Sequence, residues 1–179
     1  PALLYRPKAR RLAKRAAILA LHPTSPLGKH RVTKTGGAPN RAYAYELARR
    51  GYVVIAPDYP PFGDYAYDFE SDDYVSGTMK GILNHMRCVD LLQSLPEVDP
   101  GRIGAIGHSL GGHNAMFVGV FDTRIKVIVS SCGWTPFHDY YGGNITGWTS
   151  DRYMPLLKTR YNLDPRKCGE SGRGAGGAG

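Results

Sequence analysis

Apolar runs and helix-like periods alternate along the first 130 residues of this chain. Four short runs are continuously apolar, which is typical of parallel strands that are covered on both faces. They are residues 16–21, 52–56, 103–107 and 125–130. Over Met79–Leu95, apolar residues instead recur every three or four positions, which predicts a helix. This alternation predicts an α/β fold with a doubly wound, mostly parallel sheet.

Shorter signals complete the predicted order of elements. Ala2–Tyr5 is expected to form a short strand, and residues 152–161 a short helix. Asn40 is expected to cap a helix that runs through Glu46 to Arg50, with Gly51 as its C-terminal stop.

Binding sites of open parallel sheets lie at the carboxyl ends of the strands. Four predicted loops follow such ends, so we expect them to converge on one cleft. They are residues 22–28, 57–65, 107–112 and 131–138.

One of these loops has the spacing of a nucleophile elbow. The third apolar run leads into Gly107-His108-Ser109-Leu110-Gly111, and an apolar, helix-like segment follows. A G-x-S-x-G sequence between a strand and a helix places the serine on a sharp, strained corner. A Cβ atom two residues before or after the serine would collide with neighbouring backbone, which explains the glycines. The alternative is an ordinary glycine and serine turn between a strand and a helix.

The net charge of +8 is concentrated at one end of the chain. Residues 1–45 contain ten Lys and Arg and no acidic residue, whereas residues 46–179 contain thirteen basic and fifteen acidic residues. The densest stretch, residues 6–15, could bind phosphate or a membrane surface. A solvated basic hairpin is the simpler interpretation, because no aromatic residues are interleaved as a nucleic-acid groove requires.

Composition excludes several other classes of protein. Cys88, Cys132 and Cys168 are too scattered for a disulfide framework or a zinc site, and the first two are expected to be buried thiols. No cofactor or metal site is predicted, and no apolar run is long enough to span a membrane. We expect one domain over residues 1–165 and a flexible glycine-rich tail over 166–179.

Four segments together resemble a known superfamily. They are Leu19–Thr24, Ala56–Tyr59, Val98–Ile103 and Gly107–Gly112. They are similar to the α/β-hydrolase superfamily, and closest to its dienelactone-hydrolase-like and prolyl-oligopeptidase-like esterase branch. The resemblance extends over residues 2–165 and implies the α/β-hydrolase fold.

The resemblance also implies roles for individual residues. Ser109 corresponds to the nucleophile, and the backbone N–H of Leu110 to the first donor of the oxyanion hole. The second donor comes from the loop after residues 16–21. Thr24 is the candidate there, because Pro23 has no N–H.

This sequence differs from the family pattern at the acid and the base of the triad. In the resembling family both follow later strands, in the order Ser, Asp or Glu, His. After Ser130 this sequence has no further apolar run, so the resemblance implies a fragment whose fold is incomplete at its C-terminal side. His138, beside Asp139, is a spare base within the chain, and His22 also follows a predicted strand.

Three functions are compatible with these observations. The first is a serine hydrolase that acts on a small-molecule ester or related acyl substrate, with no nucleic acid or membrane partner. The second is a catalytically inactive hydrolase fragment or pseudoenzyme. The third is a basic binding module that uses residues 6–15. The sequence leaves the oligomeric state and the compartment open, with the cytoplasm slightly favoured.

Overall fold

The structure is a computed structural model that describes residues 1–8, 13–35, 40–71, 73–74 and 76–160. The chain forms two compact units. The first consists of Pro1–Asp68 and Met79–Trp134, and the second of Phe69–Thr78 and Thr135–Gly179. Each unit is described by itself below.

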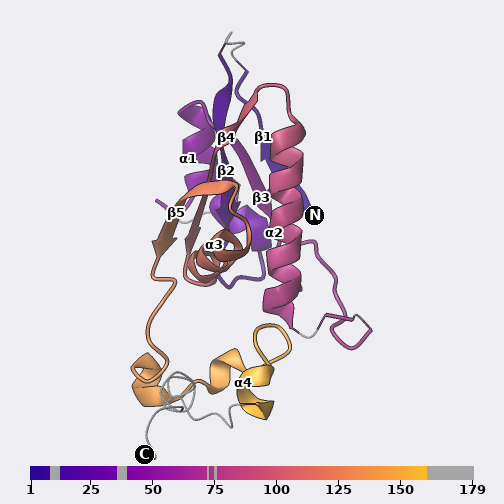
Figure 1. Ribbon diagram of the computed structural model, residues 1–179, viewed down its shortest axis with the longest axis vertical. Helices are drawn as coiled ribbons and strands as arrows, with labels where there is room; N and C mark the ends of the chain where they lie inside the picture. Colours follow the sequence, from indigo (N-terminus) through magenta and orange to yellow (C-terminus); the bar gives the residue numbers. More distant parts are fainter. Residues whose placement is uncertain (9–12, 36–39, 72, 75, 161–179) are drawn as a thin grey trace, which may run out of the picture. The chain divides into compact units, whose positions relative to one another are not determined.

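The first unit is built on a five-stranded sheet with the order β1-β3-β2-β4-β5 (Figure 1). The strands are β1 (Ala2–Tyr5), β2 (Arg15–Leu21), β3 (Val53–Pro57), β4 (Val98–His108) and β5 (Ile125–Ser131). Strands β3, β2, β4 and β5 are parallel neighbours, and β1 pairs with β3 in the antiparallel sense. The predicted strands and the mostly parallel α/β sheet are therefore confirmed.

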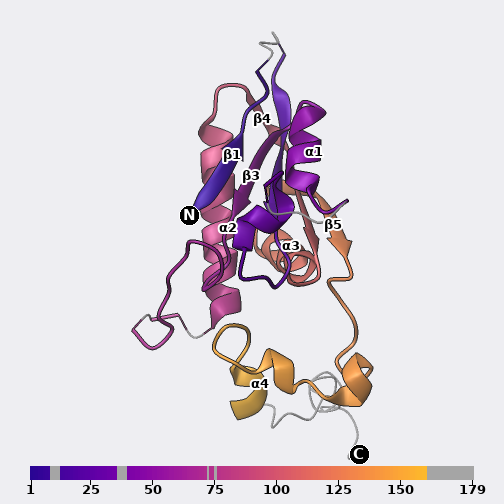
Figure 2. The same ribbon diagram turned by 180° about the vertical axis from the view of Figure 1, so that it is seen from behind.

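Helices cover both faces of this sheet, as Figures 1 and 2 show from opposite sides. On one face lie η1 (Gly28–Val32) and α1 (Tyr43–Arg49), and on the other α2 (Gly77–Ser94) and α3 (Leu110–Phe121). The α2 and α3 face contains the larger of the two hydrophobic clusters, and it includes fully buried residues of β2 and β3. The predicted helix over 79–95 is thus confirmed as α2.

The predicted cap of α1 is wrong. The helix begins at Tyr43, with Ala42 at its N-cap position and no side-chain cap hydrogen bond. Asn40 instead has a φ of 64°, the left-handed conformation that asparagine tolerates better than most residues. The predicted end is right, because the helix finishes before Gly51, whose φ is 99°.

β5 is the outermost strand of the described sheet, and its side chains are largely exposed. Only Ile125 is buried, and Val127 is 62% exposed. Cys132, which follows β5 with a φ of 51°, is exposed as well. The expectation of a buried thiol is therefore wrong for Cys132, because its apolar neighbours belong to a strand with one uncovered side.

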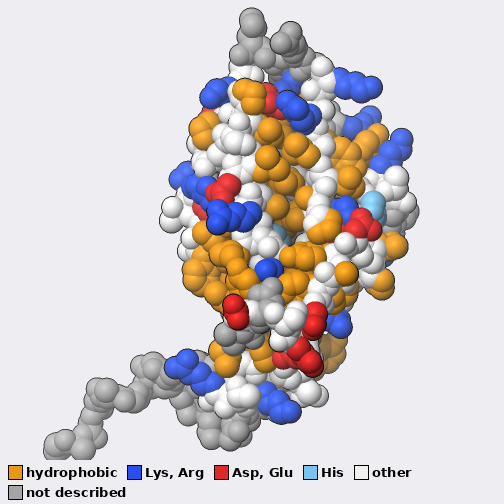
Figure 3. Space-filling view, turned by 90° about the vertical axis from the view of Figure 1, so that its right-hand side faces the viewer, with side chains coloured by type: hydrophobic (Ala, Val, Ile, Leu, Met, Phe, Trp, Pro, Cys, Tyr) orange, Lys and Arg blue, Asp and Glu red, His pale blue; other side chains and the backbone are white. Residues whose placement is uncertain are grey.

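Hydrophobic side chains are also visible on the surface at the opposite edge of the sheet. Figure 3 views the side that carries β1 and α2, and hydrophobic side chains run along this face. The exposed large residues on these two elements are Leu4, Met79, Leu83 and Leu91. Both edge strands of the described sheet, β1 and β5, are thus at least partly exposed, and exposed apolar side chains lie on or beside them.

The second unit contains short helical turns. They are η2 (Tyr140–Gly143), η3 (Thr146–Trp148) and α4 (Leu156–Thr159). Its two segments are joined by backbone hydrogen bonds from Gly77 N to Asp151 O and from Thr78 N to Tyr153 O. The helix predicted over 152–161 is confined to α4 within the described residues, and the tail over 166–179 lies outside them. Among the helices described, none has the length and apolar character to cross a bilayer.

Candidate functional site

Ser109 occupies the corner between β4 and α3 in a conformation that few residues adopt. Its φ is 54° and its ψ is −119°, and the residue is exposed. Its N–H donates to Ser131 O (2.8 Å), and its carbonyl accepts from His113 N (2.9 Å), the first bond of α3. Backbone of this kind costs energy and persists only where the surroundings hold it.

The two glycines of the elbow leave no room for side chains. A Cβ on Gly107 would lie 2.7 Å from the nitrogen of Gly112, in the first turn of α3. A Cβ on Gly111 would lie 2.6 Å from the carbonyl carbon of Leu21, at the end of β2. The strand, the turn and the helix therefore pack at distances that only glycine permits, as the sequence predicted.

This packing places the N-terminus of α3 against the end of β2. Leu110 is the first residue of α3, so its N–H has no acceptor within the helix. The N-terminal end of a helix also carries a partial positive charge. Backbone at this corner can thus stabilise an oxyanion that develops beside Ser109.

The loop after β2 is held by the buried side chain of His22. Its Nε2 accepts a hydrogen bond from Tyr59 N (2.9 Å), so the ring proton lies on Nδ1, which donates to Pro23 O (2.7 Å). Burial lowers the pKa of His22, which keeps the ring neutral. Both ring nitrogens have backbone partners, so His22 positions the loop and has no free nitrogen to act as a base.

A second contact between the same two loops is the buried pair of Lys29 and Asp58. Asp58 accepts hydrogen bonds from Lys29 N (2.7 Å), Lys29 Nζ (2.6 Å) and Asp64 N (3.0 Å). Burial alone would lower the pKa of Lys29, but its bonds to Asp58 and Asp64 outweigh burial and raise it. The loops after β2 and β3 are thereby fixed to each other.

Two other histidines are structural. His85, on α2, is completely buried, and burial lowers its pKa to about 3. His113, on α3, stacks on Phe117, and burial lowers its pKa to about 4. Both rings therefore stay neutral at physiological pH, as expected for packing residues.

The predicted site residues are distributed over both units. Ser109, Leu110 and the loop that contains Thr24 belong to the first unit, and the contact of Gly111 with Leu21 brings the corner and the loop together. Thr24 is exposed. His138 belongs to the second unit, where its Nε2 lies 3.4 Å from Asp139 Oδ2 and both side chains are exposed. Sequence reasoning missed Lys29, whose role depends on a carboxylate 29 positions away.

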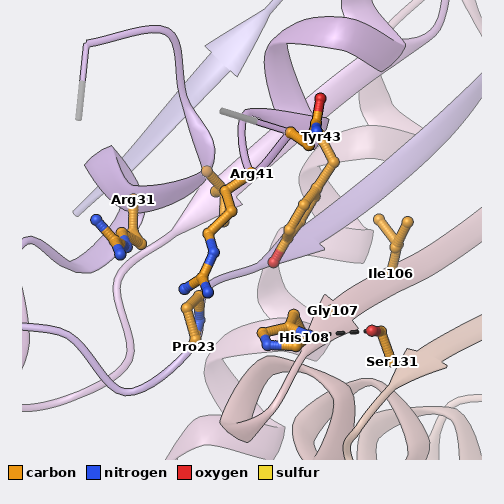
Figure 4. A pocket seen from close by; sticks show the side chains of 10 residues that line it. Pro23, Arg31, Arg41, Tyr43, Ile106, Gly107, His108 and Ser131 are labelled. Carbon is orange, nitrogen blue, oxygen red and sulfur yellow. Dashed lines mark hydrogen bonds between the residues drawn. The ribbon is translucent and has the colours of Figure 1, made fainter. Parts of the chain in front are cut away.

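A cavity of about 280 Å³ borders this corner (Figure 4). Pro23, His108 and Ser131 line it from the carboxyl ends of β2, β4 and β5, and His108 Nδ1 lies 3.0 Å from Ser131 Oγ. Arg31 and Arg41 line it from η1 and from the segment before α1. The described residues contain no group of three or more metal-ligating side chains.

Comparison with known proteins connects this geometry to a family. The chain is 35% identical over 104 residues to YtaP of Bacillus subtilis, which is named as a hydrolase. The matched region covers 54% of this chain and 35% of YtaP. It is 31% identical over 97 residues to a Saccharomyces cerevisiae protein named as a carboxymethylenebutenolidase. That match covers 49% of this chain and 35% of the yeast protein. The chain thus spans about a third of each of these relatives.

Solved structures give the same fold. The glucuronoyl esterase from Solibacter usitatus superposes with a TM-score of 0.61 at 22% identity, over 92% of this chain and 53% of the esterase. With the mostly parallel sheet and its covering helices, this likeness identifies the α/β-hydrolase fold. In sequence, residues 40–176 match the prolyl oligopeptidase family. The chain therefore belongs to the prolyl oligopeptidase family, within the α/β-hydrolase superfamily.

Proposed function

We propose that this chain carries the nucleophile and the oxyanion donors of a serine hydrolase that acts on carboxylic esters or related acyl compounds. The observation that carries the proposal is the backbone of Ser109, whose φ of 54° and ψ of −119° are combined with an exposed position. The crowding at Gly107 and Gly111 supports it, because two close approaches are maintained around one strained serine.

The proposed reaction follows from these positions. The Oγ of Ser109 attacks the acyl carbonyl, and the N–H of Leu110 and a donor from the loop of Thr24 stabilise the oxyanion. A histidine of the whole protein accepts the serine proton and returns it to the leaving alcohol. The departure of the alcohol leaves an acyl ester on Ser109. Water, deprotonated by the same histidine, attacks this ester and releases the acid, and the histidine returns the proton to the Ser109 hydroxyl. His22 and His85 are unsuited to that role, since one has both nitrogens bonded and the other is fully buried.

A catalytically inactive hydrolase fragment or pseudoenzyme would have the same fold. Only a measurement of the reactivity of Ser109 can separate it from an active serine hydrolase. A fluorophosphonate probe reacts with a serine whose hydroxyl is accessible and is activated by a base, beside an oxyanion hole. We expect mass spectrometry to place the probe on Ser109, and Ser109→Ala to abolish labelling. Ser94→Ala is the matched control, because Ser94 is an exposed serine at the end of α2. Labelling that is equal in Ser109→Ala would refute the proposal.

The basic binding module receives less support. Two of the cations in residues 6–15 are occupied within the fold. Arg6 pairs with Glu97 (2.5 Å), and the guanidinium of Arg15 donates to Gly51 O (2.9 Å). Arg15 is also mostly buried. These contacts leave fewer charges for a polyanion, whose binding would show a steep dependence on salt.

A further inference from the structure

The cavity beside the elbow is lined by two arginines, Arg31 and Arg41, that the proposed chemistry does not use. Gly107 and His108, which line it, directly precede Ser109 in the chain. In Figure 4 the guanidinium group of Arg41 extends toward Pro23, and Arg31 lies beyond Arg41, at the end of the cavity away from Ile106 and Ser131. No acidic side chain is among the described residues that line it.

Arg31 and Arg41 differ from the other arginines of the described chain. Arg102 pairs with Asp99, and Arg124 binds both Asp90 and Asp122. For Arg31 and Arg41, by contrast, the structure gives no hydrogen bond or ion pair with any other described residue. Their donors are therefore available to a ligand.

The fold supports Arg31 from both sides. It lies in η1 between buried residues, Lys29 and Val32, and Lys29 is fixed by the Asp58 carboxylate. Thr33, also buried, donates from its hydroxyl to His30 O (3.1 Å). A cation on such a rigid segment loses less conformational freedom when it binds than one on a free loop.

The other described residues that line the cavity include no further Lys, Arg, Asp or Glu. The Tyr43 hydroxyl donates to Leu21 O, and burial raises its pKa, so that the phenol remains protonated. Ile106 and Val32 supply apolar surface to the cavity. A ligand with a short alkyl part and one anionic end would match this distribution.

We propose that Arg31 and Arg41 form an anion subsite that binds an oxyanion group of the substrate, a carboxylate or a phosphate. This inference rests on the proposed function of Ser109 and specifies its substrate class as anionic acyl compounds. Guanidinium groups suit the role because they present paired N–H donors that match two oxygens of one anion. Two of them around one cavity also select against neutral acyl groups, which would leave both cations without a partner.

The first test is equilibrium binding of small probes to the whole chain, measured by calorimetry at neutral pH and low salt. The probes are glutarate, its neutral analogue glutaramide, and inorganic phosphate in a separate arm. We expect at least one of the two anions to bind and glutaramide not to bind. The preferred anion then identifies the oxyanion.

Matched variants test the residues. In Arg31→Gln/Arg41→Gln we expect the affinity for the preferred anion to fall by roughly tenfold or more, as loss of two charge-assisted contacts predicts. Arg87→Gln/Arg102→Gln removes the same net charge at exposed positions outside the cavity, and should change the affinity by less than about twofold. Equal affinity in the cavity variant and the wild type, or no binding of either anion, would overturn the subsite.

A second readout separates this inference from the proposed function. The preferred anion should slow fluorophosphonate labelling of Ser109 in the wild type, and the cavity double variant should lose this protection. If Ser109 resists labelling while the anion binds through the arginines, the nucleophile proposal fails and the subsite stands. If labelling proceeds and the arginine variants bind the anion normally, the subsite fails alone.

Discussion

Strands β3 and β5 are parallel members of one sheet, and both are rich in valine and isoleucine, but their surroundings are opposite. Every residue of β3 is buried, from Val53 to Pro57. In β5 only Ile125 is buried, and Val127, Ile128 and Val129 are 62%, 42% and 47% exposed. β3 lies between β1 and β2, whereas β5 pairs only with β4 among the described strands.

The difference shows what a hydrophobic run reports. It indicates that a segment is suited to burial on both faces, but it does not name the elements that provide the cover. β3 receives its cover from β1, β2 and helices on both faces, while α3 contacts β5. We therefore expect substitutions around β3 to be costly and equivalent ones around β5 to be mild.

The largest expected effect concerns residues at the carboxyl ends of the two strands. Asp58→Ala should reduce the free energy of unfolding by about 3–5 kcal/mol, because it leaves the buried Lys29 without its main partner. Ser131→Ala, at the end of β5, removes only a hydroxyl that lies 3.0 Å from His108, and should cost about 1 kcal/mol or less. Urea unfolding of both variants provides the comparison, and equal losses would contradict it.

A matched pair of isosteric substitutions tests the strands themselves. Val54→Thr places a hydroxyl in a fully buried position, and should cost about 1–3 kcal/mol. Val127→Thr places the same hydroxyl on an exposed surface, and should change stability by about 0.5 kcal/mol or less. A large loss in Val127→Thr would show that β5 is covered in solution.

The buried His85 of α2 should also make the free energy of unfolding depend on pH. Burial lowers the pKa of His85 from 6.5 to about 3, so the unfolded chain binds this proton first. The stabilisation is complete above 6.5 and is lost as the pH falls toward 3, by about 1.4 kcal/mol per pH unit. His85→Gln should flatten this part of the stability profile. His138→Gln, at an exposed position, should leave it unchanged.

The smallest effect leaves stability unchanged and concerns thiol reactivity. Cys132 follows β5 and is exposed, whereas burial raises the pKa of Cys88, on α2, to about 12. In a Cys168→Ser background, Cys132 should react with iodoacetamide at least about tenfold faster than Cys88. Peptide mapping of the alkylated chain measures the two rates. Similar rates would mean that the core around α2 opens as readily as the end of β5.

The parts of the structure that the sequence predicted are those with local causes. The four parallel strands are continuous apolar runs, and the corner at Ser109 follows from glycines within two residues of it. The buried location predicted for Cys132 was wrong because exposure depends on what covers β5. The buried pair of Lys29 and Asp58 was not predictable, since the two residues meet only after β2 and β3 pair. That Arg31 and Arg41 line one cavity likewise depends on how η1 and the segment before α1 fold together.

Asp58 also restricts how this sequence can change during evolution. A Cβ on Gly63 would lie 2.5 Å from its Cγ, and a Cβ on Gly28 would lie 2.7 Å from the Cα of Gly63. Both glycines have left-handed backbone, with a φ of 51° at Gly28 and 65° at Gly63. Neither glycine can therefore accept a side chain while its two neighbours stay as they are, and Asp58 holds Lys29. Descendants of this gene should therefore inherit Gly28, Asp58 and Gly63 as a set.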